Sequence, residues 1–442
     1  MSRTDQNTGI VIWTTTAVMF AACGPAGATG PLTYARDVKP IVDASCGGCH
    51  VEGGIAPFEL TTYDDVKLHR FAIAAATKLR TMPPVLAAKG CSEYTNDLSL
   101  SDEQISTLGA WAESDALEGE APEASKPVDT SQAGLSRIDL ELPMPIVYTP
   151  RQSPDDYRCF VMEWPRQGFS YVTGFRAKPG NAQVVHHVIA YLAGPEYAAE
   201  FEALDAAEDG PGYTCFGGAN GIGGGTGWLG AWAPGAIGGM YPDDTGILVR
   251  PGSKVILQVH YNTLGKTGDL SDRTTVELAL TDSVKHRAAY VPFTNFSWIR
   301  NGGMTIPAHE SDVVHSYRID PTPYWGLVTA GALPNGVALK VHSAAAHQHL
   351  LGTKSKQEVL RKDGTNECLL DIPRWDFHWQ QAYWLAKPKL VKPGDQLSIT
   401  CHWDNSMANQ PVVDGKRLMP RDADWGESTT DEMCLGLLYV SE

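Results

Sequence analysis

The sequence lacks any run of the roughly 18–20 consecutive apolar residues that a helix needs to cross a bilayer, which excludes a polytopic membrane protein. Basic residues are also scarce, since 35 Lys and Arg stand against 51 Asp and Glu and give a formal net charge of −16. No cluster of Lys or Arg offsets this charge, so the field repels phosphate backbones and we expect no nucleic acid partner. Charged residues make up only 19% of the chain, which excludes a disordered or coiled-coil protein.

Turn-forming residues are abundant, with 44 Gly and 29 Pro in 442 residues. This length predicts a multidomain protein of two to four domains. After about residue 135 the chain has short runs rich in Val, Ile, Tyr and Trp between Gly, Pro and Asp turns, which is typical of strands. The clearest runs are Val255–Tyr261, Leu339–His342 and Gln396–His402. We therefore expect about 300 residues of β-protein at the C-terminal end.

The N-terminal part has a different pattern. The pattern of residues 33–115 predicts helices at Asp64–Arg80 and Asp102–Asp115. Ser101 and Gln104 form a capping box at the start of the second. Residues 116–135 are rich in Glu, Ala, Pro, Ser and Thr without periodicity, which is typical of a linker. A domain boundary is expected there.

The first residues predict export. The segment Gly9–Ala22 is mostly apolar and ends in small residues, so residues 1–22 read as a signal peptide. Phe20–Cys23 resembles a bacterial lipoprotein box, in which Cys23 is lipidated after cleavage, and simple cleavage before Pro31 is the alternative. We expect a periplasmic or outer-membrane lipoprotein of a bacterium, with residues 23–32 as a tether and a membrane contact only through lipid at Cys23.

The nine cysteines fit export. In an oxidising compartment six of them can form up to three disulfides, whose connectivity the spacing leaves open. These six are Cys91, Cys159, Cys215, Cys368, Cys401 and Cys434.

Cys46-Gly47-Gly48-Cys49-His50 is the five-residue pattern of covalent c-type haem, in which two thiols bond the haem vinyl groups and the adjacent His binds iron. A zinc site would need a second pair of ligands and none lies nearby, while a redox dithiol would not need the His. The pattern therefore predicts covalent haem c on Cys46, Cys49 and His50.

The expected sixth iron ligand is Met82, since it is the only Met in this region and precedes Pro83, which favours extended backbone that can present a thioether. His69 is the alternative. Residues 33–115 resemble small cytochromes c, which implies a small all-α haem domain that transfers electrons.

Two sets of histidines follow the linker. The first is His186 and His187 together with His260, which strand alternation places on the more polar face of Val255–Tyr261. Adjacent histidines on a regular strand point to opposite faces, so His186 and His187 can share a metal only through a bulge, a strand end or Nδ1 coordination. Three imidazoles suit copper and zinc alike.

The second set is His347 and His349, whose spacing puts both rings on one strand face. Further ligands are needed, and Met433 is a candidate because a thioether favours Cu(I) over zinc. The alternative is that the histidines are ordinary polar or core residues and that Met433 is a core residue.

Four ordered strings resemble the copper type II ascorbate-dependent monooxygenases over about residues 136–442: Val185–Val188, Leu257–Tyr261, His347–Gly352 and Asp431–Cys434. The resemblance implies two all-β, jelly-roll-like domains, residues 136–290 and 291–442, facing across a solvent-filled cleft with one copper ion each. The ligands of the electron-relay copper would be His186, His187 and His260. The ligands of the catalytic, dioxygen-binding copper would be His347, His349 and Met433.

The implied reaction is hydroxylation of a C–H bond of a small organic or peptide-like substrate by dioxygen. Electrons would come from an external donor, ascorbate or a redox protein, through the fused haem. By the same resemblance Cys159 would pair with Cys215 and Cys401 with Cys434. It assigns no partner to Cys91 or Cys368.

The substrate-binding positions depart from the peptide-amidating members of that family. An Arg two residues before the His pair, and Asn and Tyr after the Met, are replaced here by Ala345, Leu435 and Leu437. These replacements predict a substrate that is less polar than a peptidyl-glycine or held differently. The alternative functions are a non-catalytic exported copper and electron carrier, and a zinc hydrolase, which would need a catalytic carboxylate beside the metal.

Overall fold

The computed structural model describes Met1, residues 30–120 and residues 134–442, apart from positions 53, 55, 96, 223–224, 235, 237, 300–301 and 414. The predicted signal peptide after Met1, the lipidation site Cys23 and residues 121–133 of the predicted linker lie outside the described residues. No helix in the described part of the chain is long and apolar enough to cross a membrane.

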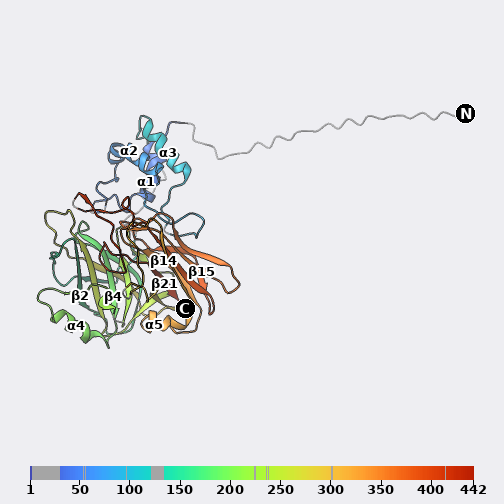
Figure 1. Cartoon of the computed structure of the whole chain (residues 1–442). Helices are drawn as coiled ribbons and strands as arrows, with labels where there is room; N and C mark the ends of the chain where they lie inside the picture. The colour runs from blue at the N-terminus through green and yellow to red at the C-terminus, as the bar shows by residue number, and fades with distance from the viewer. Residues whose placement is uncertain are drawn as a thin grey trace.

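The described residues form five α-helices and two short helices of other types, a π-helix and a 3-10 helix. The α-helices are α1 (Lys39–Ser45), α2 (Tyr63–Lys78), α3 (Asp102–Glu113), α4 (Ala198–Ala206) and α5 (Trp325–Val328), and the others are η1 (Tyr34–Val38) and η3 (Thr322–Tyr324). The predicted capping box of Ser101 and Gln104 begins α3, and a second one, Thr62 with Asp65, begins α2. Helices α1 to α3 lie together at one end of a larger body of sheets (Figure 1).

The prediction of a separate all-α haem domain is wrong. The molecule is mostly β-sheet, and between α2 and α3 the described residues form no helix. Residues 81–95, called the strap below, instead lie on the C-terminal β half, which is the part of the chain from about residue 291 to residue 442. Leu86 is 7% exposed and packs in the core of that half, as Tyr94 does in part. The helical patterns on either side of the strap led to the prediction of an all-α domain. Pro83 and Pro84 end the helical pattern, and the apolar residues that follow bury against strands.

The strap is bonded to the C-terminal half at several points. Ala88 N–H donates to Asp371 O at 2.7 Å, and Thr95 N–H donates to Trp384 O at 2.8 Å. Cys91 and Cys368, to which the sequence analysis assigned no partner, form a disulfide between the strap and a strand of that half. The N-terminal segment is thus an attached part of the molecule.

The strands other than β6 form one nine-stranded, one five-stranded and one four-stranded sheet and one isolated pair. Their bounds are β1 (Leu140–Pro143), β2 (Asp155–Glu163), β3 (Ser170–Lys178), β4 (Val185–Ala193), β5 (Tyr213–Thr214), β6 (Ala219–Ile222), β7 (Thr226–Trp232), β8 (Gly239–Met240), β9 (Thr245–Val249), β10 (Lys254–Asn262), β11 (Thr275–Thr281), β12 (His286–Phe293), β13 (Val313–Ile319), β14 (Leu339–His347), β15 (Gly352–Leu360), β16 (Asn366–Ile372), β17 (Tyr383–Val391), β18 (Gln396–Trp403), β19 (Val412–Val413), β20 (Lys416–Arg417) and β21 (Leu435–Ser441).

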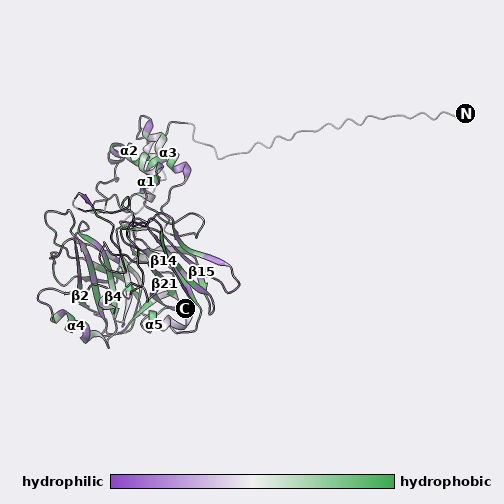
Figure 2. Ribbon diagram, in the orientation of Figure 1, coloured by the Kyte–Doolittle hydropathy of each residue, from purple (hydrophilic) through white to green (hydrophobic). Residues whose placement is uncertain are grey.

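The nine-stranded sheet runs through both β halves in the order β1-β11-β3-β9-β12-β21-β14-β17, with β8 paired to β3. The five-stranded sheet β5-β2-β10-β4-β7 belongs to the N-terminal β half, and the four-stranded sheet β13-β18-β15-β16 to the C-terminal one. The two largest apolar cores lie mainly one in each half, and these β-rich halves fit the two predicted copper domains. Both hydrophobic and hydrophilic residues occur along their strands (Figure 2).

The disulfides support the sequence analysis. Cys159 bonds Cys215 and Cys401 bonds Cys434, as the family resemblance implied. With the strap disulfide, all six predicted cysteines are paired, which fits an oxidising compartment.

Candidate metal centres

The first histidine set depends on a bulge between β4 and β10. His260 pairs with His187, but the next residue, Tyr261, pairs with Val185, so His186 is an extra residue in the ladder. Such a bulge breaks the alternation of side chains. It brings His186 and His187 to the same place, which the sequence allowed only through an irregularity of this kind.

The ring nitrogens of this set converge. The three histidines offer ligand atoms that all lie within 4.8 Å of one another. His260 Nε2–H donates to Asp155 Oδ1 at 2.9 Å, which leaves its Nδ1 lone pair 3.3 Å from His187 Nδ1. Both ring nitrogens of His186 are buried with no hydrogen-bond partner among the described residues. Burying unpaired imidazole nitrogens that face one another costs free energy unless a cation binds them, so the set fits a metal ion.

Burial also fixes the charge of these rings. Desolvation lowers the pKa of His186 and of His187 well below the ordinary value, and that of His260 falls despite the nearby Asp155 carboxylate. The imidazoles are therefore neutral at pH 7, which is the state that binds metals.

Asp155 orients this set from outside. Its carboxylate accepts hydrogen bonds from His260, from Asn262 Nδ2 at 2.9 Å and from Thr429 Oγ1 at 3.1 Å. We expect Asp155→Ala to weaken copper binding at the first set about 10–100-fold, because loss of such a partner frees the ligand ring. Copper titration followed by electron paramagnetic resonance measures this, with Asp312→Ala, which removes the partner of the remote His402, as the control. Equal affinity in wild type and Asp155→Ala would contradict the role of Asp155.

The second set lies at the end of β14. His347 Nε2 and His349 Nε2 are 3.2 Å apart. His349 Nδ1–H donates to Asp431 O at 3.1 Å, and His347 Nδ1–H donates to Gln380 Oε1. Both Nε2 atoms are therefore unprotonated, and burial lowers the pKa of His347 to about 4 and that of His349 to about 3. Two facing lone pairs again fit a shared metal ion.

Met433 is carried next to this pair. It is 5% exposed and follows Glu432, whose carboxylate accepts from His349 N–H at 2.9 Å. The disulfide of Cys434 fixes the other side of Met433. The structure thus brings the chain around Met433 to the His347 and His349 pair, and its role as a third ligand stays a prediction.

Glu427, in the loop that precedes Met433, predicts a pH dependence of stability. Burial, and next the Asp431 charge, raise its pKa from 4.5 to about 7. Between these values the folded state keeps a proton that the unfolded chain has released, so the free energy of unfolding falls as pH rises from about 4.5 to about 7, by about 3 kcal/mol.

We expect Glu427→Gln to remove this contribution, so that the variant loses less stability than wild type between pH 5 and pH 7.5. Urea unfolding of the metal-free protein at both pH values measures it. Glu141→Gln, at an exposed position of β1, is the control and should keep the wild-type slope. The same slope in Glu427→Gln as in wild type would show that Glu427 titrates normally.

The two sets adjoin. The rings of His187 and His347 have centroids 6.5 Å apart, which leaves no wide cleft between these side chains. Phe377 of the C-terminal half stacks on His186 with centroids 4.6 Å apart and also faces His349 at 6.1 Å. The loop of residues 374–380, which carries Phe377 and Gln380, therefore contacts both sets.

Sequence reasoning missed these supporting residues. Asp155, Phe377 and Gln380 stand in no motif, and only the fold brings them to the histidines. Glu432 lies inside one of the recognised strings, but its role depends on donors from His349, Leu351 and Trp403 that the sequence does not reveal.

The predicted haem ligands lie in the helical segment. Cys46 and Cys49 are not disulfide-bonded, and His50 Nδ1–H donates to Phe58 O at 3.0 Å, which leaves Nε2 available. Phe58 lies between His50 and His69, with centroids 4.7 Å and 4.0 Å away. Met82 is 39% exposed and lines a cavity between the helical segment and the C-terminal half.

Comparison with known proteins points to one family. The model of the copper type II ascorbate-dependent monooxygenase C-terminal domain matches residues 327–441. Dopamine beta-hydroxylase of Canis lupus familiaris is 25% identical over 215 residues, which cover 48% of this chain and 31% of that protein. Dopamine beta-hydroxylase of Bos taurus is 26% identical over 338 residues, covering 73% and 48%.

DBH-like monooxygenase protein 2 of Mus musculus is 24% identical over 263 residues, which cover 58% of this chain and 38% of that protein. The chain thus spans about a third to a half of the length of these relatives. The matches support the copper type II ascorbate-dependent monooxygenase family, which binds two copper ions.

Proposed function

We propose that this protein is an exported copper-dependent monooxygenase that hydroxylates a C–H bond of a small organic or peptide-like substrate with dioxygen. The observation that carries the proposal is the pair of adjoining, buried histidine sets whose neutral ring nitrogens face one another. The family match covers the second set, and the relatives named above are hydroxylases and monooxygenases.

In this proposal His186, His187 and His260 hold one copper ion, and His347, His349 and Met433 hold the other. Copper would supply electrons by cycling between Cu(II) and Cu(I), and a thioether ligand such as Met433 favours the reduced ion. The protein's own residues fix the ligand rings: Asp155 holds His260, Gln380 holds His347 and Asp431 holds His349. Burial keeps all five imidazoles neutral.

The electron supply in this proposal comes from ascorbate or a redox protein, through covalent haem on Cys46, Cys49 and His50. Support comes from the unbonded thiols and from the His50 Nε2 left available by the Phe58 bond. Leu68 and Phe71 on α2 and Leu79 directly after it are 75%, 59% and 71% exposed, an apolar surface that a prosthetic group could cover. Met82 remains the proposed sixth ligand, with His69 as the alternative.

Metal analysis tests the copper assignment. We expect about two copper ions per wild-type chain, and about one in His187→Ala and in Met433→Ala. His342→Ala is the matched control, because His342 is a buried histidine of β14 that contacts Ser441 instead of the second set, and it should keep both ions. Zinc in place of copper, or full copper in Met433→Ala, would reject the assignment.

Dioxygen consumption separates the monooxygenase from a copper and electron carrier. A monooxygenase with a suitable substrate forms hydroxylated product in proportion to the dioxygen consumed. A carrier would show copper reduction and reoxidation without product, and that result would reject catalysis while leaving the copper sites in place.

A further inference from the structure

The segment of residues 427–433, called the bridging loop below, contacts both histidine sets. It belongs to the C-terminal β half. Near its start, Thr429 Oγ1–H donates to Asp155 Oδ2 of the other β half at 3.1 Å. Near its end, Asp431 O accepts from His349 Nδ1–H at 3.1 Å. One short segment thus reaches a supporting carboxylate of the first set and a ring of the second.

At the first set, the bridging loop contacts both supports of the His260 ring. The Asp155 carboxylate accepts from His260 Nε2–H with one oxygen and from Thr429 with the other. The Tyr157 ring stacks on His260 with centroids 4.0 Å apart and planes 8° from parallel, and its hydroxyl donates to Glu427 O at 3.0 Å. A shift of the loop would therefore turn the His260 ring and move its Nδ1, the nitrogen left for a metal ion.

Within the bridging loop a turn ties these two contacts together. Asp431 N–H donates to Ser428 O at 2.8 Å, which closes a turn around Thr429 and Thr430. Arg421 adds an ion pair to the Asp431 carboxylate at 3.2 Å. Because Thr429 and Asp431 belong to one hydrogen-bonded turn, a displacement of either residue reaches the other.

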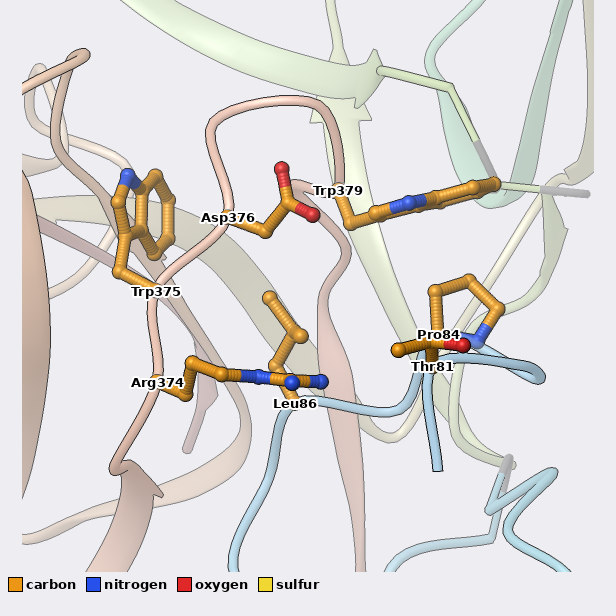
Figure 3. Close-up of a pocket in the computed structure, with 7 residues that line it drawn as sticks. All are labelled: Thr81, Pro84, Leu86, Arg374, Trp375, Asp376 and Trp379. Atoms are coloured by element: carbon orange, nitrogen blue, oxygen red, sulfur yellow. The ribbon is translucent and has the colours of Figure 1, made fainter. Parts of the chain in front are cut away.

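The 374–380 loop also contacts both sets, through Phe377 and Gln380. Four of its residues face the strap across a cavity of about 200 Å³, toward which Arg374 and Trp379 extend in Figure 3. Atoms beside a cavity lack packing partners on that side, so this loop can take up a displacement there. The bridging loop, held by its own turn, is the stiffer connection between the sets.

We propose that Thr429 is a positioning residue of the first set and that the bridging loop couples the two sets. When His349 is fixed as a ligand of a copper ion, Asp431 O and the turn are fixed with it. Thr429 then holds Asp155 and the His260 ring, so less ordering remains when the first set binds its own ion. By linkage, the loop favours binding at the second set by the same factor once the first set is filled. The coupling rests on the proposed function for its copper ions.

Copper titrations of the full-length protein measure the coupling. His347→Ala leaves the first set alone, and His187→Ala leaves the second set alone. The constant for binding both ions in the parent, divided by the product of the two single-set constants, is the coupling factor. We expect Thr429→Val, placed in all three backgrounds, to lower this factor about 5-fold or more, because the hydroxyl that donates to Asp155 is lost. Repulsion between the two ions is the same in both series and cancels.

The spectrum of the first set gives a second measurement. In the His347→Ala background we expect Thr429→Val to change the electron paramagnetic resonance spectrum of Cu(II) in the first set, because the His260 ring is no longer held in the same orientation. An unchanged spectrum would reject Thr429 as a positioning residue.

Two variants serve as matched controls. Thr429→Ser keeps the hydroxyl and should keep the wild-type factor and spectrum. Thr430→Val removes the neighbouring hydroxyl of the same turn, which contacts Ser428 and Arg421 instead of Asp155, and should also keep the wild-type factor. Two bound copper ions with equal factors in wild type and Thr429→Val, or an equal fall in Thr430→Val, would overturn the coupling alone. A wild-type chain that binds no copper would reject the proposed function and the coupling with it.

Discussion

Replacing His349 with alanine is expected to lower copper-dependent dioxygen consumption more than about 100-fold, because loss of an outer partner of a metal ligand alone costs about 10–100-fold. His349 is held by Asp431 O at Nδ1 and by the Glu432 carboxylate at its backbone N–H, and its Nε2 faces His347. Alanine offers no ligand atom in place of this nitrogen. Oxygen-electrode measurements on copper-loaded protein, with excess reductant, give the rate.

His342→Ala is the control for this prediction. His342 lies on the same strand, is 8% exposed and bonds Ser441 Oγ at 2.8 Å, so its loss removes a buried histidine without touching either set. We expect this variant to keep wild-type dioxygen consumption at a temperature where it is folded. A similar loss in both variants would mean that destabilisation, and not ligand removal, explains the effect of His349→Ala.

The double variant Cys91→Ser, Cys368→Ser is expected to lose about 3–5 kcal/mol of unfolding free energy. These cysteines are 277 positions apart, and a disulfide that closes a long loop restricts the unfolded chain strongly. The strap would also detach more readily, because its remaining anchors are hydrogen bonds and a few buried side chains. Denaturant unfolding in non-reducing buffer measures the loss.

Ser92→Ala is the matched control for the disulfide. Ser92 is next to Cys91 and its Oγ–H donates to Cys368 O at 2.7 Å, so its loss removes one strap contact and leaves the covalent bond. A hydrogen bond of this kind contributes about 0.5–1.5 kcal/mol. If the double serine variant lost no more than Ser92→Ala, the disulfide would not be what stabilises the strap.

Local sequence patterns predicted the parts of this molecule that local rules govern. Alternation along Val255–Tyr261 placed His260 opposite the core face, and the structure packs Val255, Leu257, Val259 and Tyr261 in one core while Ile256 packs in another. The capping box of Ser101 likewise fixed the start of α3. The adjacent histidines 186 and 187 required an irregular strand, and the ladder contains it.

Long-range contacts could not be read in the same way. The resemblance to monooxygenases covered residues 136–442, so it gave no partner for Cys91 and no reason to place the strap on β strands. Helical patterns around the strap then led to an all-α domain. From the other β half Phe377 contacts His186 and Thr429 contacts Asp155, and contacts of this kind depend on the tertiary arrangement alone.

The strap disulfide also imposes an order on maturation. A chain that enters an oxidising compartment N-terminus first presents the Cys46, Cys49 and Cys91 thiols, then Cys159 and Cys215, and only later Cys368. At about 5–20 residues per second of synthesis, a separation of 277 positions corresponds to a wait of roughly 14–55 s. A disulfide that Cys91 forms during that interval is non-native, and thiol–disulfide exchange must replace it once Cys368 has arrived.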